Sequence, residues 1–302
     1  MYKYFCVDRI DREGLLLFTE DYIQTDKISE ADCLFVRSTD LRSMKIPDQV
    51  KIIARAGAGI SNLPLEECEK RKIKVVNTPG ANANGVKELV IAGMLLASRG
   101  ILQGVRWVEN YAEKEKISIK TEKVKKNFAG CELKGKKAGV IGLGAIGSLV
   151  ADTLKIFGMN VYGCDPYLTE EKKKEWEEKG IWIVSQEEIY KNCDYITIHV
   201  PEEESTKGMI GKEELHCMKE GTVLLNFSRS SIVDEGSILY ALEKGKIKRY
   251  VTDFPTDEIR GEKGVLAIPH LGASTKESEE NCAKEAVKKV MKFFDEENFR
   301  KS

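Results

Sequence analysis

The chain has 302 residues, of which 42% are hydrophobic and 32% are charged, and these fractions are typical of a globular protein with a sizeable core. The formal net charge of −1 gives no overall attraction to nucleic acid or to acidic membranes. No apolar run reaches the ~18 residues that a transmembrane helix needs. Asp8 and Arg9 end the first apolar run, which therefore reads as a strand rather than a signal peptide. We expect a cytoplasmic protein with no nucleic-acid or membrane partner and room for two domains.

Cysteine spacing gives no sign of a metal site or a disulfide framework. No two cysteines form a C-x-x-C pair, and several lie inside apolar runs. We therefore expect buried free thiols in a reducing compartment, and no bound metal. The eight cysteines are Cys6, Cys33, Cys68, Cys131, Cys164, Cys193, Cys217 and Cys282.

The first third of the chain alternates strand-like and helix-like runs, which favours a small parallel α/β unit. We predict strands over 4–7, 33–36, 50–54 and 73–76, and helices over 63–71, 86–97 and 104–116. The glycine-rich run from Arg55 to Asn62 follows one of these strands. Such a loop can direct several backbone N–H groups at an anion, and a flexible turn is the plain alternative.

Lysines are dense between residues 117 and 137. One interpretation is a solvated linker, and the other is a cationic rim that attracts a phosphorylated or polyanionic substrate. The lysines are Lys120, Lys123, Lys125, Lys126, Lys134, Lys136 and Lys137.

The strongest pattern is the apolar run that ends in Gly142-Leu-Gly144-Ala-Ile-Gly147. It opens into an amphipathic helix over 148–157, and a second apolar strand then ends in Asp165. In dinucleotide-binding units the three glycines permit the tight turn, the approach of the pyrophosphate and close packing of the helix on the strand. The helix N-terminus favours the phosphates. A carboxylate at Asp165 suits a ribose 2′-OH and repels a 2′-phosphate, so we expect NAD rather than NADP.

Polar residues follow several later strands. We predict strands over 195–198, 222–226, 250–252 and 265–268, and helices over 169–179, 234–244 and 278–294. Ligands bind beyond the carboxyl ends of strands in doubly wound sheets, so Arg229, Asp253 and His270 are expected to converge. The other two histidines, His199 and His216, are more simply explained as structural or surface residues, although His199 ends a strand near the expected cofactor.

Five motifs, in the correct order, resemble those of the D-isomer-specific 2-hydroxyacid dehydrogenase family, and within it the phosphoglycerate dehydrogenases. The resemblance covers nearly the whole chain. A sixth run, 35–39, Phe-Val-Arg-Ser-Thr, also looks like the phosphoglycerate dehydrogenases. The five motifs are the runs 55–62, 77–82, 142–147, 226–235 and 269–275.

The resemblance implies a fold of two doubly wound parallel-sheet domains, with a Rossmann-type NAD domain inserted into a flavodoxin-like substrate domain. The substrate domain would comprise 1–98 plus 276–302, and the NAD domain 99–275. No C-terminal regulatory domain is expected to follow the terminal helix. The long helices after Val86 and Gly104 would make the contacts of a homodimer.

The resemblance also implies roles for individual residues. Arg229 matches the arginine that holds the substrate carboxylate and carbonyl, and His270 matches the general acid/base. The glutamate that partners the histidine matches Glu258 better than Asp257, because Glu258 stands five positions after Asp253. Positions that match substrate contacts are Arg55, Ala58, Gly59 and Lys125. Positions that match cofactor contacts are Thr78, Gly142, Gly144, Ala145, Ile146, Gly147, Asp165, Val200, Phe227, Ser228, Asp253, Gly272 and Ala273.

Three positions depart from the family pattern. Ser61 stands where an aspartate is common, Ser230 stands where a glycine usually follows the arginine, and Ala145 replaces a larger residue that is often basic. None of them is a proposed catalytic group.

The expected reaction is NAD-dependent oxidation of D-3-phosphoglycerate to 3-phosphohydroxypyruvate, a step toward L-serine. A guanidinium suits the planar carboxylate, and a histidine can manage the single proton. One alternative is the same chemistry on glyoxylate, hydroxypyruvate or a larger 2-oxo acid. Another is a non-catalytic NAD(H)-sensing protein that resembles corepressors of this fold.

Overall fold

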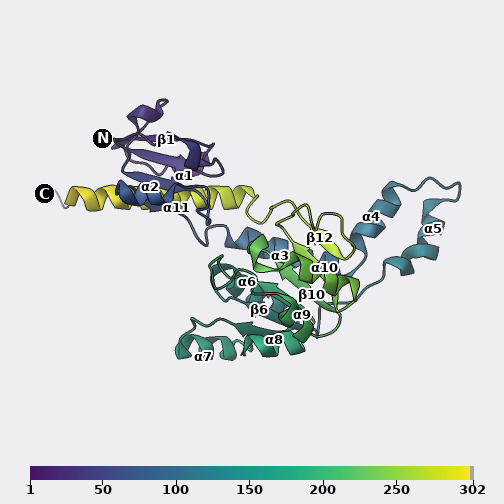
Figure 1. Ribbon diagram of the computed structural model, residues 1–302. Coiled ribbons are helices and arrows are strands. Elements are labelled where there is room, and N and C mark those ends of the chain that lie inside the picture. The colour runs from purple at the N-terminus through teal and green to yellow at the C-terminus, as the bar shows by residue number, and fades with distance from the viewer. Residues whose placement is uncertain (300–302) are drawn as a thin grey trace. The chain divides into compact units, whose positions relative to one another are not determined.

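The computed structural model describes residues 1–299, which fold into two compact units (Figure 1). The first unit comprises Met1–Gly85 and the segment that begins at Ala273. The second unit comprises Val86–Gly272, so it is inserted into the first. Each unit is built around one parallel sheet, which confirms the predicted α/β class.

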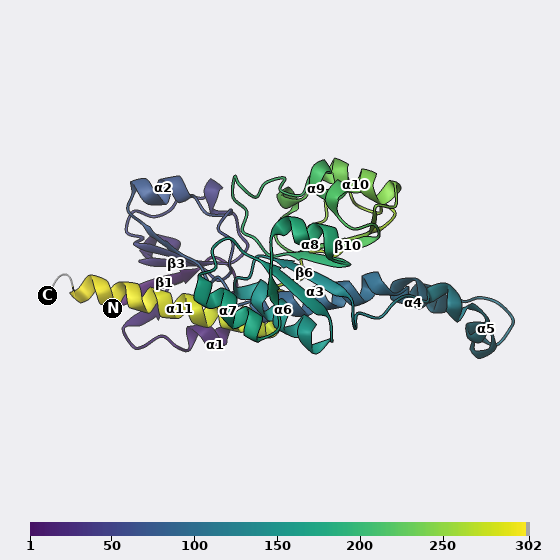
Figure 2. The same cartoon turned by 90° about the horizontal axis from the view of Figure 1, so that it is seen from below.

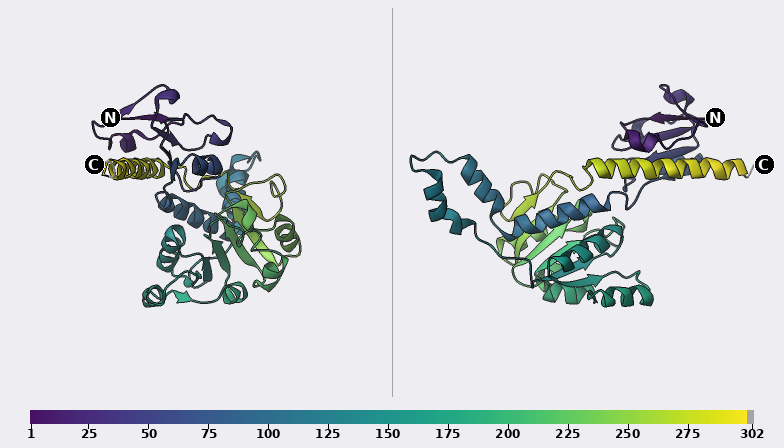
Figure 3. Two further views of the ribbon diagram at one scale, coloured as in Figure 1. Left: turned by 60° about the vertical axis from the view of Figure 1, so that its left-hand side comes forward. Right: turned by 180° about the vertical axis from the view of Figure 1, so that it is seen from behind.

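The first unit has five strands in the order β2-β1-β3-β4-β5, the flavodoxin-like order. Its helix α11 covers one face of the sheet through Ala283, Val287 and Phe294, and Figure 3 shows this helix end-on and from behind. The elements are β1 (Tyr2–Cys6), α1 (Arg12–Leu15), β2 (Tyr22–Gln24), β3 (Cys33–Val36), β4 (Ile52–Arg55), α2 (Leu65–Lys70), β5 (Lys74–Val76) and α11 (Lys276–Phe299).

The second unit has seven parallel strands in the order β12-β11-β10-β9-β6-β7-β8. Counted from β6, this is the doubly wound order 3-2-1-4-5-6 with one added strand, and the connections reverse direction between β6 and β9. The strands are β6 (Lys137–Ile141), β7 (Asn160–Cys164), β8 (Trp182–Ile183), β9 (Tyr195–Ile198), β10 (Thr222–Asn226), β11 (Ile247–Thr252) and β12 (Val265–Ala267).

Helices cover both faces of this second sheet. Side chains of α3 and α6 pack on one face, and those of α8, α9 and α10 pack on the other; the ribbons of these helices are labelled in Figure 2. Helices α4 and α5 lie away from the sheet in the views of Figures 1 and 2. The helices are α3 (Ala83–Ser98), α4 (Ile101–Glu109), α5 (Ile117–Val124), α6 (Ala145–Ile156), α7 (Glu170–Glu178), α8 (Gln186–Asn192), α9 (Lys212–Cys217) and α10 (Glu235–Glu243).

Helix α3 explains why the compact units divide near Gly85 instead of at residue 98. Its buried residues Val86, Val90 and Met94 belong to the same core as Val140 and Val251 of the second sheet. Most of the helix is therefore part of the second unit. The functional division at 98 and 275 stays a prediction.

The predicted bounds of the helix near residue 110 are wrong. The helix expected over 104–116 begins at Ile101 and ends at Glu109, where Asn110 is the C-cap and its side-chain amide donates to the Arg106 carbonyl at 2.7 Å. The lysine-dense stretch contains helix α5 and a 3₁₀ turn over Lys125–Phe128, and both interpretations of it, a solvated linker and a cationic rim, stay open. Ion pairs from Lys120 and Lys123 tie α5 to the acidic segment before it.

All eight cysteines are free thiols, but the expected burial holds for only half of them. Four of them are buried and one, Cys217, is exposed. No single helix within residues 1–299 is long and apolar enough to cross a membrane; α3 and α4 together have the length and composition, but they are bent by 75°.

Candidate active site

The glycine turn after β6 has the geometry that its sequence predicts. Gly142 adopts a φ of +88°, and a Cβ there would lie 2.7 Å from the His199 carbonyl oxygen. A Cβ on Gly147 would lie 1.8 Å from the Gly142 carbonyl oxygen, so α6 packs on the turn too closely for any side chain. A Cβ on Gly144 would meet nothing within 4 Å. The turn therefore leaves no space for a side chain at Gly142 or Gly147, whereas the space beside Gly144 is open.

Asp165 lies against this turn from the end of β7. Its Oδ2 accepts a hydrogen bond from the Leu143 amide at 2.9 Å, and its Oδ1 accepts one from the Tyr167 amide at 2.9 Å. The second lone pair of each oxygen stays available for a ligand. Thus the carboxylate predicted from spacing alone lies beside the predicted phosphate turn.

His199 follows β9 next to the glycine turn. The residue is partly exposed but its Nδ1 atom is buried, and burial of the ring lowers its pKa to about 3, so the imidazole is neutral. Its Nε2 lies 2.9 Å from the Thr197 hydroxyl, whereas Nδ1 has no hydrogen-bond partner among residues 1–299. A neutral, enclosed ring agrees with the structural interpretation of His199. His216, in α9, is exposed.

The end of β10 places Arg229 at the carboxyl edge of the sheet. The Ser228 hydroxyl donates to the Ile198 carbonyl at 2.9 Å, which ties the segment to β9, and Phe227 is buried just before it. The Arg229 guanidinium donates to the Ser228 carbonyl at 2.6 Å and lies 5.4 Å from the Phe254 ring centroid. Arg229 is thus held by the backbone on one side and by an aromatic ring on the other.

Phe254 also contacts His270, and the sequence analysis did not single it out. The centroids of its ring and the imidazole are 4.6 Å apart. Phe254 follows the residue after β11, and His270 closely follows β12, so two strand ends bring them together. His270 is exposed and adopts a φ of +41°, unusual for a residue other than glycine. In the sequence, the only signal that could have pointed to Phe254 is that an aromatic residue follows Asp253, the acid at the end of a predicted strand.

Asp253, the residue that follows β11, is hydrogen-bonded to the segment that contains His270. Its backbone carbonyl accepts a hydrogen bond from the His270 amide at 2.9 Å, and its Oδ2 accepts one from the Gly272 amide at 3.2 Å. Its Oδ1 is buried and has no hydrogen-bond partner in the described part of the chain. Burial raises the pKa of Asp253, and the neighbouring His270 and Arg229 oppose that rise.

The carboxylates that compete for the role of histidine partner are both exposed. Asp257 lies 3.7 Å from Arg260 in an ion pair. Within residues 1–299, no hydrogen bond or ion pair joins Glu258 or Asp257 to His270. The neighbouring Thr256 hydroxyl donates to Glu235 at 2.8 Å, which fastens this loop to α10. The pairing of Glu258 with His270 therefore stays a prediction.

Several predicted site residues belong to the first unit. Arg55 ends β4, and its Nη1 would lie 2.8 Å from a Cβ on Gly57, so the guanidinium folds over the glycine-rich loop. The Asn77 amide donates to the Ala58 carbonyl at 2.5 Å, and the Thr78 amide donates to the Gly57 carbonyl at 2.9 Å. The loop and the turn after β5 are thereby joined. The convergence of Arg55, Ala58, Gly59, Thr78 and Ala273 with the second unit stays a prediction.

Lys125 follows α5 and is exposed, with its amine paired to the Glu122 carboxylate. Ala145 and Ile146 form the first turn of α6, and Val200 follows His199, so all three lie beside the glycine turn. The residues of this edge fit a dinucleotide because an open glycine at a helix N-terminus faces the phosphate position and a carboxylate lies beside it. At the same edge Arg229 carries a guanidinium, which can bind an anion, and His270 carries an imidazole, which can transfer a proton.

Comparison with known proteins agrees with this geometry. Residues 91–272 match the family model of the D-isomer specific 2-hydroxyacid dehydrogenase, NAD binding domain. The chain is 36% identical over 281 residues to a D-3-phosphoglycerate dehydrogenase of Methanocaldococcus jannaschii, with 88% of this chain covered but only 51% of the relative. The chain therefore spans about half the length of that relative.

Two further matches cover nearly the full length of both chains. A hydroxypyruvate reductase of Thermotoga maritima is 33% identical over 316 residues, which is 96% of this chain and 98% of the relative. The crystal structure of an NAD⁺-bound 3-phosphoglycerate dehydrogenase of Entamoeba histolytica superposes with a TM-score of 0.74 at 29% identity. That match covers 97% of this chain and 95% of the other.

Proposed function

Because the chain belongs to the D-isomer-specific 2-hydroxyacid dehydrogenase family, we propose that it oxidises D-3-phosphoglycerate to 3-phosphohydroxypyruvate with NAD, a step of L-serine synthesis. The observation that carries this proposal is the 36% identity to the phosphoglycerate dehydrogenase of Methanocaldococcus jannaschii over most of this chain. Arg55 and Lys125 support it, because a phosphorylated substrate needs cations besides Arg229.

In this proposal Arg229 binds the planar substrate carboxylate through its guanidinium fork. His270 accepts the proton of the C2 hydroxyl during oxidation and returns it during reduction. When bound, NAD supplies the hydride acceptor. Phe254 keeps the Arg229 and His270 side chains in fixed positions, since both pack against its ring.

Glu258 is proposed as the partner of His270. A carboxylate beside the ring would favour the imidazolium that forms when the hydroxyl proton is taken, and it would fix which nitrogen faces the substrate. Glu258 lies in the loop that the Thr256–Glu235 hydrogen bond fastens to α10. Glu258→Gln should then lower kcat and shift its pH profile, whereas Asp257→Asn should change neither.

A second candidate is the reduction of hydroxypyruvate. The observation that favours it is the match to the Thermotoga maritima hydroxypyruvate reductase, which extends over almost all of both chains. The same Arg229 and His270 would serve, since both substrates carry a carboxylate beside the reacting carbon. The two candidates differ only in the need for phosphate-binding cations.

The test is the change in NADH absorbance with purified protein and a panel of D-2-hydroxy acids, run beside the reverse reactions with 2-oxo acids. Activity confined to 3-phosphoglycerate and phosphohydroxypyruvate, and lost in His270→Ala, is the expected result. Activity only on hydroxypyruvate or glyoxylate would replace the first candidate with the second. NADH binding without turnover of any acid would contradict both.

We also propose a homodimer formed through α4 and α5. Helix α4 has no buried residue among the described part of the chain, yet Ile101, Val105 and Val108 form an apolar stripe along it. Ile117 and Ile119 of α5 add to this exposed apolar surface. Light scattering after size-exclusion chromatography should report a dimer for the native chain and a monomer for Val105→Glu/Val108→Glu. A monomeric native chain would contradict this part of the proposal.

A further inference from the structure

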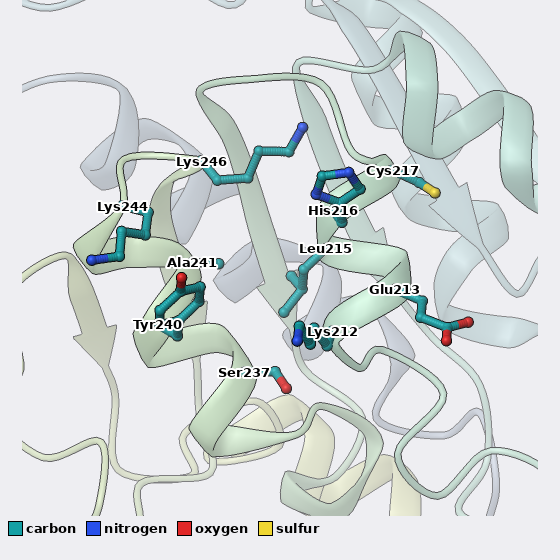
Figure 4. Close-up of a pocket in the computed structure, with 10 residues that line it drawn as sticks. All are labelled: Lys212, Glu213, Leu215, His216, Cys217, Ser237, Tyr240, Ala241, Lys244 and Lys246. Carbon is teal, nitrogen blue, oxygen red and sulfur yellow. The ribbon is translucent and has the colours of Figure 1, made fainter.

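A groove lies between α9 and α10, on the face of the second sheet that these helices cover. It has a volume of about 750 Å³, within the range of pockets that bind small organic molecules. Figure 4 shows the side chains of both helices and of the turn after α10 around it. None of the residues proposed for catalysis or cofactor binding lines it.

The floor of the groove is apolar. Leu215 of α9 and Ala241 of α10 are buried, and together they form its base. Tyr240 of α10 forms a wall; 56% of this residue is exposed, and the Lys244 amine lies 5.3 Å from its ring centroid. Covering exposed apolar and aromatic surface with an apolar or aromatic group lowers the free energy, because that surface is removed from water. The groove therefore offers a surface on which a flat ring can stack.

The rim of the groove is cationic. Lys212 lies at the start of α9 and Lys246 lies between α10 and β11, and within residues 1–299 no carboxylate lies within ion-pair distance of either amine. In Figure 4 the Lys246 amine points toward His216, whereas Glu213 points away from Tyr240 and Leu215. The acid that lines the groove thus does not neutralise its cations. An anion placed above the floor would be attracted by two separate side chains.

The position of Lys246 separates this end of the groove from the proposed active site. Lys246 directly precedes β11, and Asp253 directly follows it. Six extended residues span roughly 20 Å. A ligand held at Lys246 would therefore not overlap a cofactor bound beyond the carboxyl ends of the strands.

We propose that the α9–α10 groove is a second ligand site, which takes a small amphipathic anion with an aromatic body and a carboxylate, sulfonate or phosphate group. The aromatic body covers Leu215 and Ala241 beside Tyr240, and the cationic rim that contains Lys212 and Lys246 attracts the anionic group. The cationic rim favours ligands with a negative charge. The apolar floor favours ligands that also have an apolar part, which inorganic anions lack. This site does not depend on which 2-hydroxy acid the protein oxidises.

The probe is 1-anilinonaphthalene-8-sulfonate, titrated into the full chain by isothermal calorimetry with NAD⁺ at saturation. NAD⁺ occupies the dinucleotide site, so heat from the probe reports other sites. We expect one site whose Kd rises about ten-fold in Lys212→Glu/Lys246→Glu, because two attractive charges become repulsive. Lys212→Arg/Lys246→Arg should bind like the native chain, and Tyr240→Ala should weaken binding with the charges intact.

The matched control is Lys134→Glu/Lys174→Glu, which changes the net charge equally at two exposed lysines that do not line the groove. The control should keep the native Kd. Thermal unfolding of each variant shows that it is folded before titration. Equal weakening in the control, equal affinity in all variants, or no binding once NAD⁺ is present would each overturn the proposal.

Discussion

The imidazole of His270 packs against the ring of Phe254, with 4.6 Å between the centroids and 48° between the planes. The Arg229 guanidinium lies 5.4 Å from the centroid of the same ring. One side chain therefore orders both groups that the proposed reaction needs, although they follow different strands.

Replacing Phe254 should test this arrangement. Phe254→Ala removes the surface that both side chains contact, and misplaced catalytic groups lose rate steeply, so kcat/KM should fall about 100-fold. Affinity for NADH should change little, because the glycine turn and Asp165 are untouched. Phe254→Tyr retains the ring and should keep most of the activity. Steady-state kinetics and NADH fluorescence titration measure these values. An unchanged kcat/KM in Phe254→Ala would contradict the positioning role.

His270 combines a proposed chemical role with a positive φ of +41°. Asparagine tolerates this backbone conformation but cannot serve as an acid/base near neutral pH, so His270→Asn should unfold at nearly the native temperature and lose activity by 10²-fold or more. His270→Val should lose activity and also destabilise the fold by about 1–2 kcal/mol, because a β-branched residue is strained there. Comparable activity of His270→Asn and the native chain would rule out its role in proton transfer.

The two glycines that flank the start of α6 should respond differently to the same substitution. In Gly147→Ala the new methyl group would lie 1.8 Å from the Gly142 carbonyl oxygen, and forcing the helix off the turn should cost about 2–3 kcal/mol of unfolding free energy. In Gly144→Ala the methyl group meets nothing. Its stability should stay close to native while NADH affinity falls about ten-fold, because the methyl group occupies the space proposed for the pyrophosphate. Urea denaturation and NADH titration separate the two effects.

Asp165 should determine the preference between NAD and NADP. Asp165→Asn retains a side-chain oxygen for the Leu143 amide but removes the negative charge that repels a 2′-phosphate. The ratio of kcat/KM for NAD to that for NADP should fall about ten-fold or more. The unfolding free energy of this variant should change little, which distinguishes a charge effect from a disrupted turn. An unchanged ratio would show that another residue selects the cofactor.

His199 should make the stability of the protein sensitive to mild acid. Its pKa is about 3 in the folded protein because the ring is buried, whereas an unfolded histidine titrates near 6.5. The unfolded state therefore binds a proton that the folded state does not, and stability is lost as the pH falls below about 6.5, by up to about 1.4 kcal/mol per pH unit. His199→Gln should lack this component. Urea denaturation at pH 7, 6 and 5 measures it, and parallel slopes for the two proteins would contradict the buried, neutral assignment.

Much of the second unit was predictable from the sequence because its signals are local. The strand β10 begins and ends where the apolar run does, and Asp234 caps α10 as predicted. The glycine turn was also predictable, because each of its requirements falls on a single residue. Gly142 must adopt a positive φ, and Gly147 packs so closely that no Cβ fits. The spacing from Gly147 to Asp165 also predicted that a carboxylate would lie beside that turn.

Other features arose only in the tertiary structure, because they depend on contacts between residues distant in sequence. Phe254 gains its importance from the meeting of two strand ends, and nothing in its local sequence indicates that Arg229 and His270 both contact it. The placement of α3 in the core of the second unit, which moves the division between the compact units to Gly85, depends on which surface its apolar side covers. Local sequence determines backbone conformation and residue type, whereas burial and side-chain pairing are set by the neighbours that the folded chain supplies.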